Sequence, residues 1–177
     1  MKSASRLFPL IALVALTVIA LAPGLVAAQS NNPMAQPVPV FVPEVISVRD
    51  HDTSAYTQGL LLHDGLFYES TGRHGESTLR AVDPETGAVG QQIDVPEEYF
   101  AEGLALVDDR LIQLTWQQNV AFVYDLDTFE QVSTFEYEGE GWGLCYDGEW
   151  LYMTDGTPFI DLRDPETFEL VFSGAVT

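Results

Sequence analysis

The sequence is poor in basic residues. Its 177 residues contain 7 Lys and Arg against 27 Asp and Glu, which gives a formal net charge of −20. A chain this acidic is repelled by nucleic acid and by anionic membrane surfaces, so neither is an expected partner. The only lysine is Lys2. An acidic, lysine-poor surface fits a high-salt habitat, and we expect added salt to raise the melting temperature by screening the repulsion.

Cysteine and histidine are also scarce. Cys145 is the single cysteine, so no disulfide can form within the chain. It lies in an apolar run, which predicts a small core residue rather than a nucleophile. The histidines are His51, His63 and His74, and their spacing does not match the pairs that bind zinc. We therefore expect no metal site and no cofactor.

Residues 1–28 have the features of an export signal. Lys2 and Arg6 give a basic start, an apolar run follows over residues 7–22, and small residues at 26–28 complete a cleavage site. The apolar run is shorter than the roughly 20 residues that span a bilayer. We expect a cleaved signal, an exported protein and no stable membrane association afterwards. An uncleaved anchor is the alternative.

The rest of the chain is predicted to be a linker followed by an all-β domain. Residues 29–43 include four prolines, which disfavour both helix and central strand. One strand is expected at 44–48. From Tyr56 onward, short apolar or alternating segments are separated by turn residues, and no apolar stripe continues for three helical turns. This pattern predicts that residues 44–177 are all-β.

Two marker sequences recur three times each along this domain. A Gly-Leu pair begins at residues 59, 103 and 143, and an Asp-x-x-Thr turn begins at residues 83, 125 and 164. Units of about 40 residues with four strands are typical of β-propeller blades. Blades are expected near 56–96, 99–137 and 139–177. Their expected strands are 58–62, 66–70, 78–82 and 88–94, then 103–107, 110–115, 119–124 and 130–135, then 142–146, 150–154, 158–162 and 168–172.

Three blades do not close a ring, because natural propellers have about four to eight. An open arc also leaves an unpaired sheet edge. We therefore expect that the sequence is a fragment with about three of five blades, and that the strand at 44–48 belongs to an absent closing blade. The full-length protein is then expected to be a monomer. Closure through oligomerisation is the alternative.

The residues before the Gly-Leu pairs are the candidate functional residues. Because the first strand of each blade lines the central channel of a propeller, Gln58, Glu102 and Trp142 should converge near one mouth. A carboxylate among aromatic rings is poorly solvated, which raises its pKa and suits it to proton transfer near neutrality. An exposed turn position is the alternative for Glu102.

Three aromatic residues extend this site. Trp116 lies at the end of the strand that follows the Glu102 strand. Tyr56 stands two residues before Gln58, and Phe100 two residues before Glu102. Packing between blades is the alternative for the tryptophans. Glu138 and Glu140 flank a glycine in a predicted loop, and we expect both to be solvated.

Eight short segments, taken in order between residues 44 and 176, carry a family resemblance. They are His51–Asp52, Tyr56–Leu60, Tyr68–Gly72, Leu79–Asp83, Tyr99–Gly103, Gln113–Trp116, Gly139–Leu144 and Thr154–Thr157. Together they resemble the glutaminyl-peptide cyclotransferases of plants and bacteria, a family of five-bladed propellers. Ala101 stands where that family usually has Gly, and Tyr56 where it usually has Phe.

The resemblance implies a function. In this family an N-terminal glutaminyl residue cyclises to pyroglutamate with loss of ammonia, without a metal, so the expected partners are peptides or proteins with N-terminal Gln. It implies that Glu102 is the proton shuttle. It also implies a substrate cage made by Tyr56, Gln58, Phe100, Trp116 and Trp142. An Asn and a Lys used by the family belong to later blades than those present here.

Two other functions stay open at this point. One is a non-catalytic extracellular propeller that binds peptides through its aromatic mouth. The other is a calcium-dependent, lactonase-like propeller, which needs several converging carboxylates. Glu102 is the one acidic residue at a predicted channel position, and this disfavours the calcium site.

Overall fold

The structure, a computed structural model, describes residues 39–176. The predicted export signal and most of the predicted linker lie outside the described residues. Residues 39–43 have no regular secondary structure, and their side chains are exposed. The chain from Glu44 forms one compact unit. Within the described residues, no helix has the length and apolar character needed to cross a membrane.

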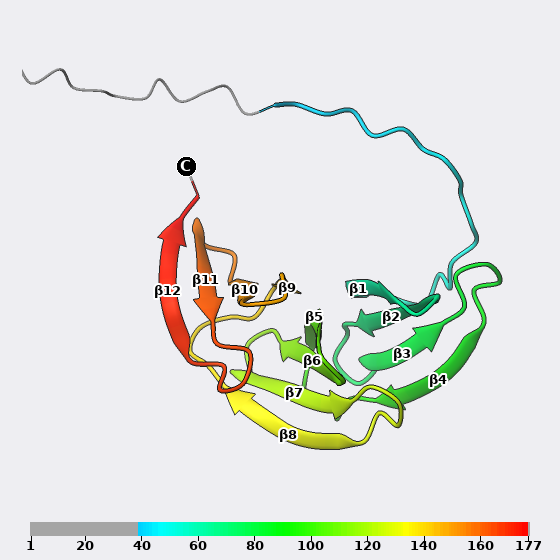
Figure 1. Cartoon of the computed structure of the whole chain (residues 1–177). Helices are drawn as coiled ribbons and strands as arrows, with labels where there is room; N and C mark the ends of the chain where they lie inside the picture. The colour runs from blue at the N-terminus through cyan, green and yellow to red at the C-terminus, as the bar shows by residue number, and fades with distance from the viewer. Residues whose placement is uncertain (1–38, 177) are drawn as a thin grey trace, which may run out of the picture. The chain divides into compact units, whose positions relative to one another are not determined.

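Residues 39–176 form twelve strands in three antiparallel sheets of four, each with its strands in chain order (Figure 1). In each sheet the first strand lies on the inner side of the arc and the last strand, β4, β8 or β12, lies on its outer side (Figure 1). The bounds are β1 Thr57–His63, β2 Leu66–Thr71, β3 Thr78–Val82, β4 Val89–Asp94, β5 Ala101–Val107, β6 Arg110–Thr115, β7 Val120–Asp125, β8 Gln131–Glu136, β9 Leu144–Tyr146, β10 Leu151–Thr154, β11 Phe159–Arg163 and β12 Leu170–Ala175. This confirms the all-β, partial β-propeller prediction.

The expected strand at 44–48 is wrong. These residues form no strand, and their side chains are exposed. A strand is stabilised by a neighbour that accepts and donates its ladder hydrogen bonds. The sheet order places no partner for this segment among the described residues, since β1 pairs with β2 alone.

The Asp-x-x-Thr turns close the outermost hairpin of each blade, as their spacing predicts. In each turn the Asp carboxylate accepts hydrogen bonds from two backbone N–H groups and from the Thr hydroxyl. The next residue has a left-handed backbone, with φ of 70° at Gly87, 57° at Phe129 and 61° at Phe168. Its N–H donates to the carbonyl of the Asp. The turn is therefore one residue longer than the four-residue turn that the motif suggests.

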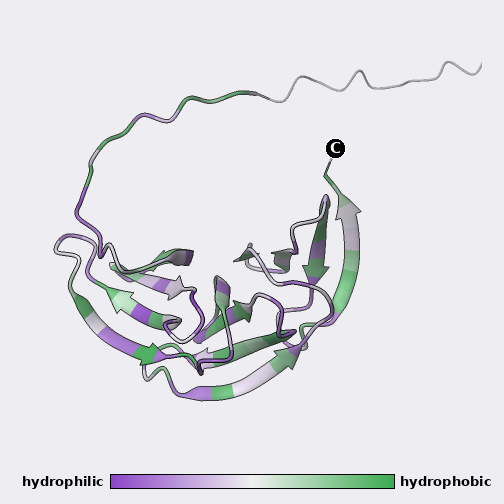
Figure 2. Ribbon diagram, turned by 180° about the vertical axis from the view of Figure 1, so that it is seen from behind, coloured by the Kyte–Doolittle hydropathy of each residue, from purple (hydrophilic) through white to green (hydrophobic). Residues whose placement is uncertain are grey.

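Two apolar clusters fill the spaces between neighbouring blades. One joins the first and second blades and contains Leu79, Leu104 and Phe129; the other joins the second and third and contains Ile112 and Phe168. Both turn phenylalanines are buried, which offsets the roughly 1–2 kcal/mol cost of a left-handed backbone at a residue with a side chain. Figure 2 shows the alternating hydrophobic and hydrophilic bands along the strands.

Glycine allows the inner strands to approach closely. A Cβ added at Gly59 would lie 2.7 Å from the backbone nitrogen of Leu104, and one added at Gly103 would lie 2.6 Å from that of Leu144. The Gly-Leu pairs therefore mark the places where β1 meets β5 and where β5 meets β9. This close backbone contact is the role expected for glycine on a crowded inner strand.

Candidate active site

An open cavity of about 400 Å³ lies at the entrance to the inner strands. All of its lining residues were predicted from the sequence to be site residues: Tyr56, Gln58, Phe100, Glu102, Trp116 and Trp142. Its volume lies within the range of about 300–1,000 Å³ that is usual for small-molecule sites. The repeat therefore brings together six residues that are spread from position 56 to position 142 of the chain.

Irregular pairing at the start of two inner strands determines where Gln58 and Glu102 lie. The register of β1 with β2 shifts between Thr57 and Gly59, and that of β5 with β6 shifts between Ala101 and Leu104. A bulge turns the side chains that it contains away from the regular alternation. Gln58 and Glu102 lie within these two shifts, which explains how both residues reach the cavity.

Aromatic side chains form one wall of the cavity. The Tyr56 and Phe100 rings meet edge to face with centroids 6.4 Å apart, and Phe100 meets Trp116 in the same way at 5.8 Å. Behind this wall, the guanidinium of Arg73 lies 5.5 Å from the Tyr56 ring centre, and the His74 ring lies 5.5 Å from that of Phe100. Contacts between the rings, and with Arg73 and His74, therefore fix the orientation of the wall side chains.

Glu102 is only partly accessible to solvent. Burial raises its pKa to about 7, the nearby Gln58 amide opposes that rise, and the negative charge of Glu140 adds to it. A carboxyl group with this pKa can both accept and donate a proton near neutrality. The alternative of an exposed turn position does not describe Glu102.

Glu140 is half-buried and has specific partners, which the expectation of a solvated loop carboxylate did not include. Its Oε2 accepts hydrogen bonds from the indole Nε1 of Trp116 at 2.7 Å and of Trp142 at 2.9 Å. Its Oε1 accepts one from the Gln117 amide at 2.8 Å. Gln117, Trp142 and Trp116, in that order, lower the pKa of Glu140 by donating to its charged form. Glu138 is exposed, as expected.

A signal for Glu140 was present in the repeat. Tyr56 and Phe100 each stand two residues before the channel residue of their blade, and Glu140 holds the same place before Trp142. The three residues occupy equivalent positions, although their side chains differ. Comparison of residue types alone hides this equivalence.

A second cavity, of about 180 Å³, lies between residues 49–52 and the first blade. Both arginines of its lining are already paired: Arg80 with Glu69 at 2.8 Å and with Asp52 at 2.9 Å, and Arg49 with Glu85 at 2.6 Å. Glu69 and Arg80 are buried, and each has further partners: Arg80 donates to Asp52, and Glu69 contacts His51 and accepts from Thr57. This network fastens the segment before β1 to the sheet, and the open cavity is the better candidate for a ligand.

Two further sequence predictions concern Cys145 and metal binding. Cys145 is exposed, which corrects the expectation of a core residue. It points away from the core because it alternates along β9 with Leu144, which is buried. Among residues 39–176 there is no group of three or more His, Cys, Asp or Glu side chains placed to hold a metal ion.

Comparison with known proteins gives consistent results. The family model described as glutamine cyclotransferase matches residues 15–177. A glutaminyl-peptide cyclotransferase of Arabidopsis thaliana is 42% identical over 130 residues, which cover 72% of this chain and 40% of the plant protein. The crystal structure of Myxococcus xanthus glutaminyl cyclase superposes with a TM-score of 0.66 at 38% identity, over 72% of this chain and 53% of that one.

More distant structures share the fold alone. The WD40 repeats of RRP9 match with a TM-score of 0.54 at 11% identity, over 69% of this chain and 39% of theirs. The chain spans about half, or less, of the length of the relatives that it matches.

Proposed function

The chain belongs to the glutamine cyclotransferase family, and we propose that the protein converts the N-terminal glutaminyl residue of peptides to pyroglutamate with release of ammonia. The observation that carries the proposal is Glu102, a carboxyl group with a pKa of about 7 inside an aromatic pocket. The pocket supplies a proton carrier and apolar walls, and this reaction requires both.

The nucleophile in this reaction is the substrate's own α-amine, so the pocket needs no serine or cysteine. Glu102, as the carboxylate, takes a proton from the α-ammonium group. The freed nitrogen forms a bond to the side-chain amide carbon of the same residue, and the bond from that carbon to the amide nitrogen breaks. Glu102 returns its proton to the departing nitrogen, which leaves as ammonia. The attacking nitrogen loses a second proton as the ring forms, and the ammonia takes up this proton to become ammonium.

Orientation supplies much of the remaining rate. The reacting atoms belong to one residue, and the reaction needs that residue to be folded back on itself. A pocket walled by Tyr56, Phe100, Trp116 and Trp142 favours a compact conformer over an extended one. Because the reaction is already intramolecular in water, the pocket contributes by restricting the rotations of the substrate side chain, and not by joining two molecules. Gln58, at the same surface, can hydrogen-bond the substrate amide.

The test measures ammonia and the cyclised product from a Gln-initiated peptide. The full-length protein that contains this chain should turn the peptide over, and Glu102→Gln should lose at least about 100-fold in kcat/KM. Glu98→Gln, at an exposed carboxylate of the preceding loop, is the matched control and should retain activity. Full activity in Glu102→Gln would reject the role of Glu102. Tight peptide binding without turnover by the wild-type protein would instead favour a peptide-binding propeller.

Activity should also depend on pH in a defined direction. The proposed base must be ionised in the free enzyme, so kcat/KM should rise as the pH increases through about 7, the pKa of Glu102. The rise should vanish in Glu102→Gln.

We also propose export, specificity for an N-terminal glutaminyl residue and a monomeric full-length protein. Export is supported by the basic start, the apolar run and the small residues of 1–28. The specificity is supported by the aromatic side chains that line the open cavity together with Gln58 and Glu102. Mass spectrometry of the N-terminal peptide of the secreted protein should find that it begins near Gln29, as Gln or as pyroglutamate, and an intact Met1 would argue for a retained anchor.

A further inference from the structure

One carboxylate oxygen joins two indoles that come from different blades. Trp116 directly follows β6 of the second blade, and Trp142 precedes β9 of the third. Oε2 of Glu140 lies 2.7 Å from Nε1 of the first and 2.9 Å from Nε1 of the second. Both rings line the cavity, so a single atom fixes the direction of two of its walls.

Glu140 is itself held on both sides. Its second oxygen accepts from the Gln117 amide at 2.8 Å, and Gln117 adjoins Trp116 in the chain. The backbone adds a direct link, because the N–H of Gly141 donates to the carbonyl of Trp116 at 2.8 Å. The loop before β9 is therefore tied to the end of β6 at the place where the carboxylate lies, and the carboxylate cannot swing away without breaking three charged hydrogen bonds.

The negative charge of Glu140 is also close to the reacting carboxyl group. Glu140 is the acidic group that raises the pKa of Glu102 in addition to burial. The other titratable groups near Glu102 are Tyr56 in the cavity wall and Tyr137, whose pKa is raised by its own burial and also by the Glu102 charge. Arg73 and His74 lie behind the Tyr56 and Phe100 rings.

We infer that Glu140 is a positioning residue for the proposed reaction: it holds the Trp116 and Trp142 rings at a fixed angle around the substrate's α-amine. The inference rests on the proposed function for its kinetic consequences, but the indole contact can be tested without turnover. Indole faces attract cations, and a carboxylate at the ring N–H places further negative charge beside a substrate ammonium group. Glu140 does not itself exchange a proton with the substrate.

The experiment compares Glu140→Gln with Glu138→Gln in the full-length protein. Glu138 is an exposed carboxylate two residues away, so its change removes the same charge without touching an indole. Glu140→Gln should raise the KM for a Gln-initiated peptide about tenfold or more and should move the acid limb of the kcat/KM profile to lower pH. Glu138→Gln should change neither. Equal effects in the two variants, or an unchanged KM and profile in Glu140→Gln, would overturn the inference.

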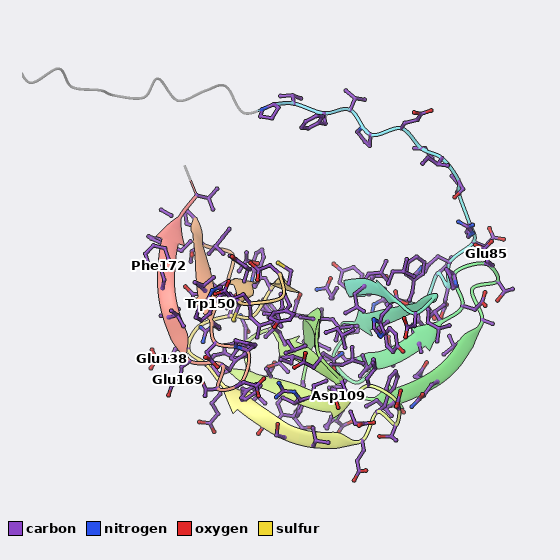
Figure 3. The ribbon with its side chains drawn as sticks, in the orientation of Figure 1. Glu85, Asp109, Glu138, Trp150, Glu169 and Phe172 are labelled. Atoms are coloured by element: carbon purple, nitrogen blue, oxygen red, sulfur yellow. The ribbon has the colours of Figure 1, made fainter. Side chains whose placement is uncertain are left out.

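The indole N–H signals in an NMR spectrum provide the readout that needs no activity. The chain has three tryptophans, and the third, Trp150, lies directly before β10 (Figure 3) and does not line the cavity. In Glu140→Gln the Trp116 and Trp142 signals should shift upfield and exchange faster, while that of Trp150 stays in place. Unmoved Trp116 and Trp142 signals would contradict the contact. If the wild type shows no turnover but these two signals move, the proposed function fails and the positioning contact stands.

Discussion

At the scale of single residues, the pocket contains two carboxyl groups whose surroundings act in opposite directions. Glu102 has few partners and is partly buried, so its pKa rises to about 7. Glu140 accepts three hydrogen bonds, led by that from Gln117, and its pKa falls. Pairs of carboxyl groups with separated pKa values are a feature of acid–base sites, since one can stay charged while the other exchanges protons.

Glycine at position 156 makes room for Trp142. A Cβ added there would lie 2.5 Å from a carbon of the indole ring, and the backbone φ is +80°. Gly156→Ala should therefore displace the Trp142 ring and reduce kcat/KM at least tenfold, in addition to a stability loss of about 1 kcal/mol from the left-handed backbone. Steady-state kinetics and thermal melting measure the two effects.

Gly148 supplies the matched control for this substitution. It has φ of +99°, and an added Cβ would meet nothing within 4 Å. Gly148→Ala should cost a similar amount of stability and leave kcat/KM unchanged. Equal losses of activity in the two variants would show that backbone strain, and not contact with Trp142, is responsible.

The sequence predicts residues at the site well where the residue type signals its use. Glu102, Gln58 and four aromatic residues were identified because they stand out at repeated positions, and the cavity contains them all. Glu140 was missed because an acidic residue in a loop of an acidic chain is usually solvated, and only its contact with two indoles reveals another use. The side on which Cys145 lies depends on the pleat of a three-residue strand, which the apolar run does not fix.

At the scale of strands, the contact between β1 and β5 depends on the absence of a side chain. The Cβ of an alanine at position 59 would lie 2.7 Å from the Leu104 nitrogen. Gly59→Ala should therefore force the two inner strands apart and reduce the free energy of unfolding by about 1–3 kcal/mol. Denaturation with urea, followed by circular dichroism, measures the change.

Gly90 in the outer strand β4 is the control for this contact. A Cβ there would lie 3.9 Å from the Ala81 carbonyl oxygen, an ordinary contact distance. Gly90→Ala should leave stability unchanged or raise it slightly. A Gly59→Ala protein as stable as the wild type would show that the blades tolerate a wider separation than the structure has.

The sequence predicts that the strands exist, but it does not predict where each one ends. It also does not show that residues 44–48 lack a pairing partner. Each of the twelve strands overlaps its expected range, because alternating apolar residues and repeated turns define the hairpins. The first strand of the third blade begins at Leu144 rather than at residue 142, since the Trp142 N–H bonds to the Thr154 carbonyl outside a regular ladder. The segment at 44–48 has strand-like composition, but pairing requires a neighbour that composition cannot supply.

At the scale of the whole molecule, charge is the dominant surface property. The net charge is −20, and acidic side chains such as Glu85, Asp109, Glu138 and Glu169 are exposed around the arc (Figure 3). At 0.1 M salt the screening length is about 10 Å, and it falls to about 3 Å at 1 M. Mutual repulsion between these groups should therefore weaken as salt is added.

The melting temperature should rise when sodium chloride is increased from about 0.05 M to about 1 M, because the screening length falls several-fold over this range. Glu136→Lys, at an exposed position of the outer strand β8, lowers the net negative charge and should make the rise smaller. A melting temperature that is independent of salt, in the wild type and in this variant, would show that repulsion does not limit stability.

The architecture explains why one family can be identified from three blades. Each blade contributes inner-strand residues to one cavity, and the chain spans 40% of the Arabidopsis protein and 53% of the Myxococcus structure. Six lining residues already converge within the described part of the chain. The proposed chemistry depends on that convergence, and above all on the raised pKa of the Glu102 carboxyl group.

A site-specific titration of Glu102 tests this account most directly. Carbon-13 NMR of the glutamate side-chain carboxyl groups, with Glu102→Gln used to assign the signal, follows its ionisation across the pH range. The account predicts that the Glu102 signal titrates with a pKa of about 7. A signal that titrates at the usual glutamate value of about 4.3 would contradict the claim that this pocket maintains a proton carrier near neutrality.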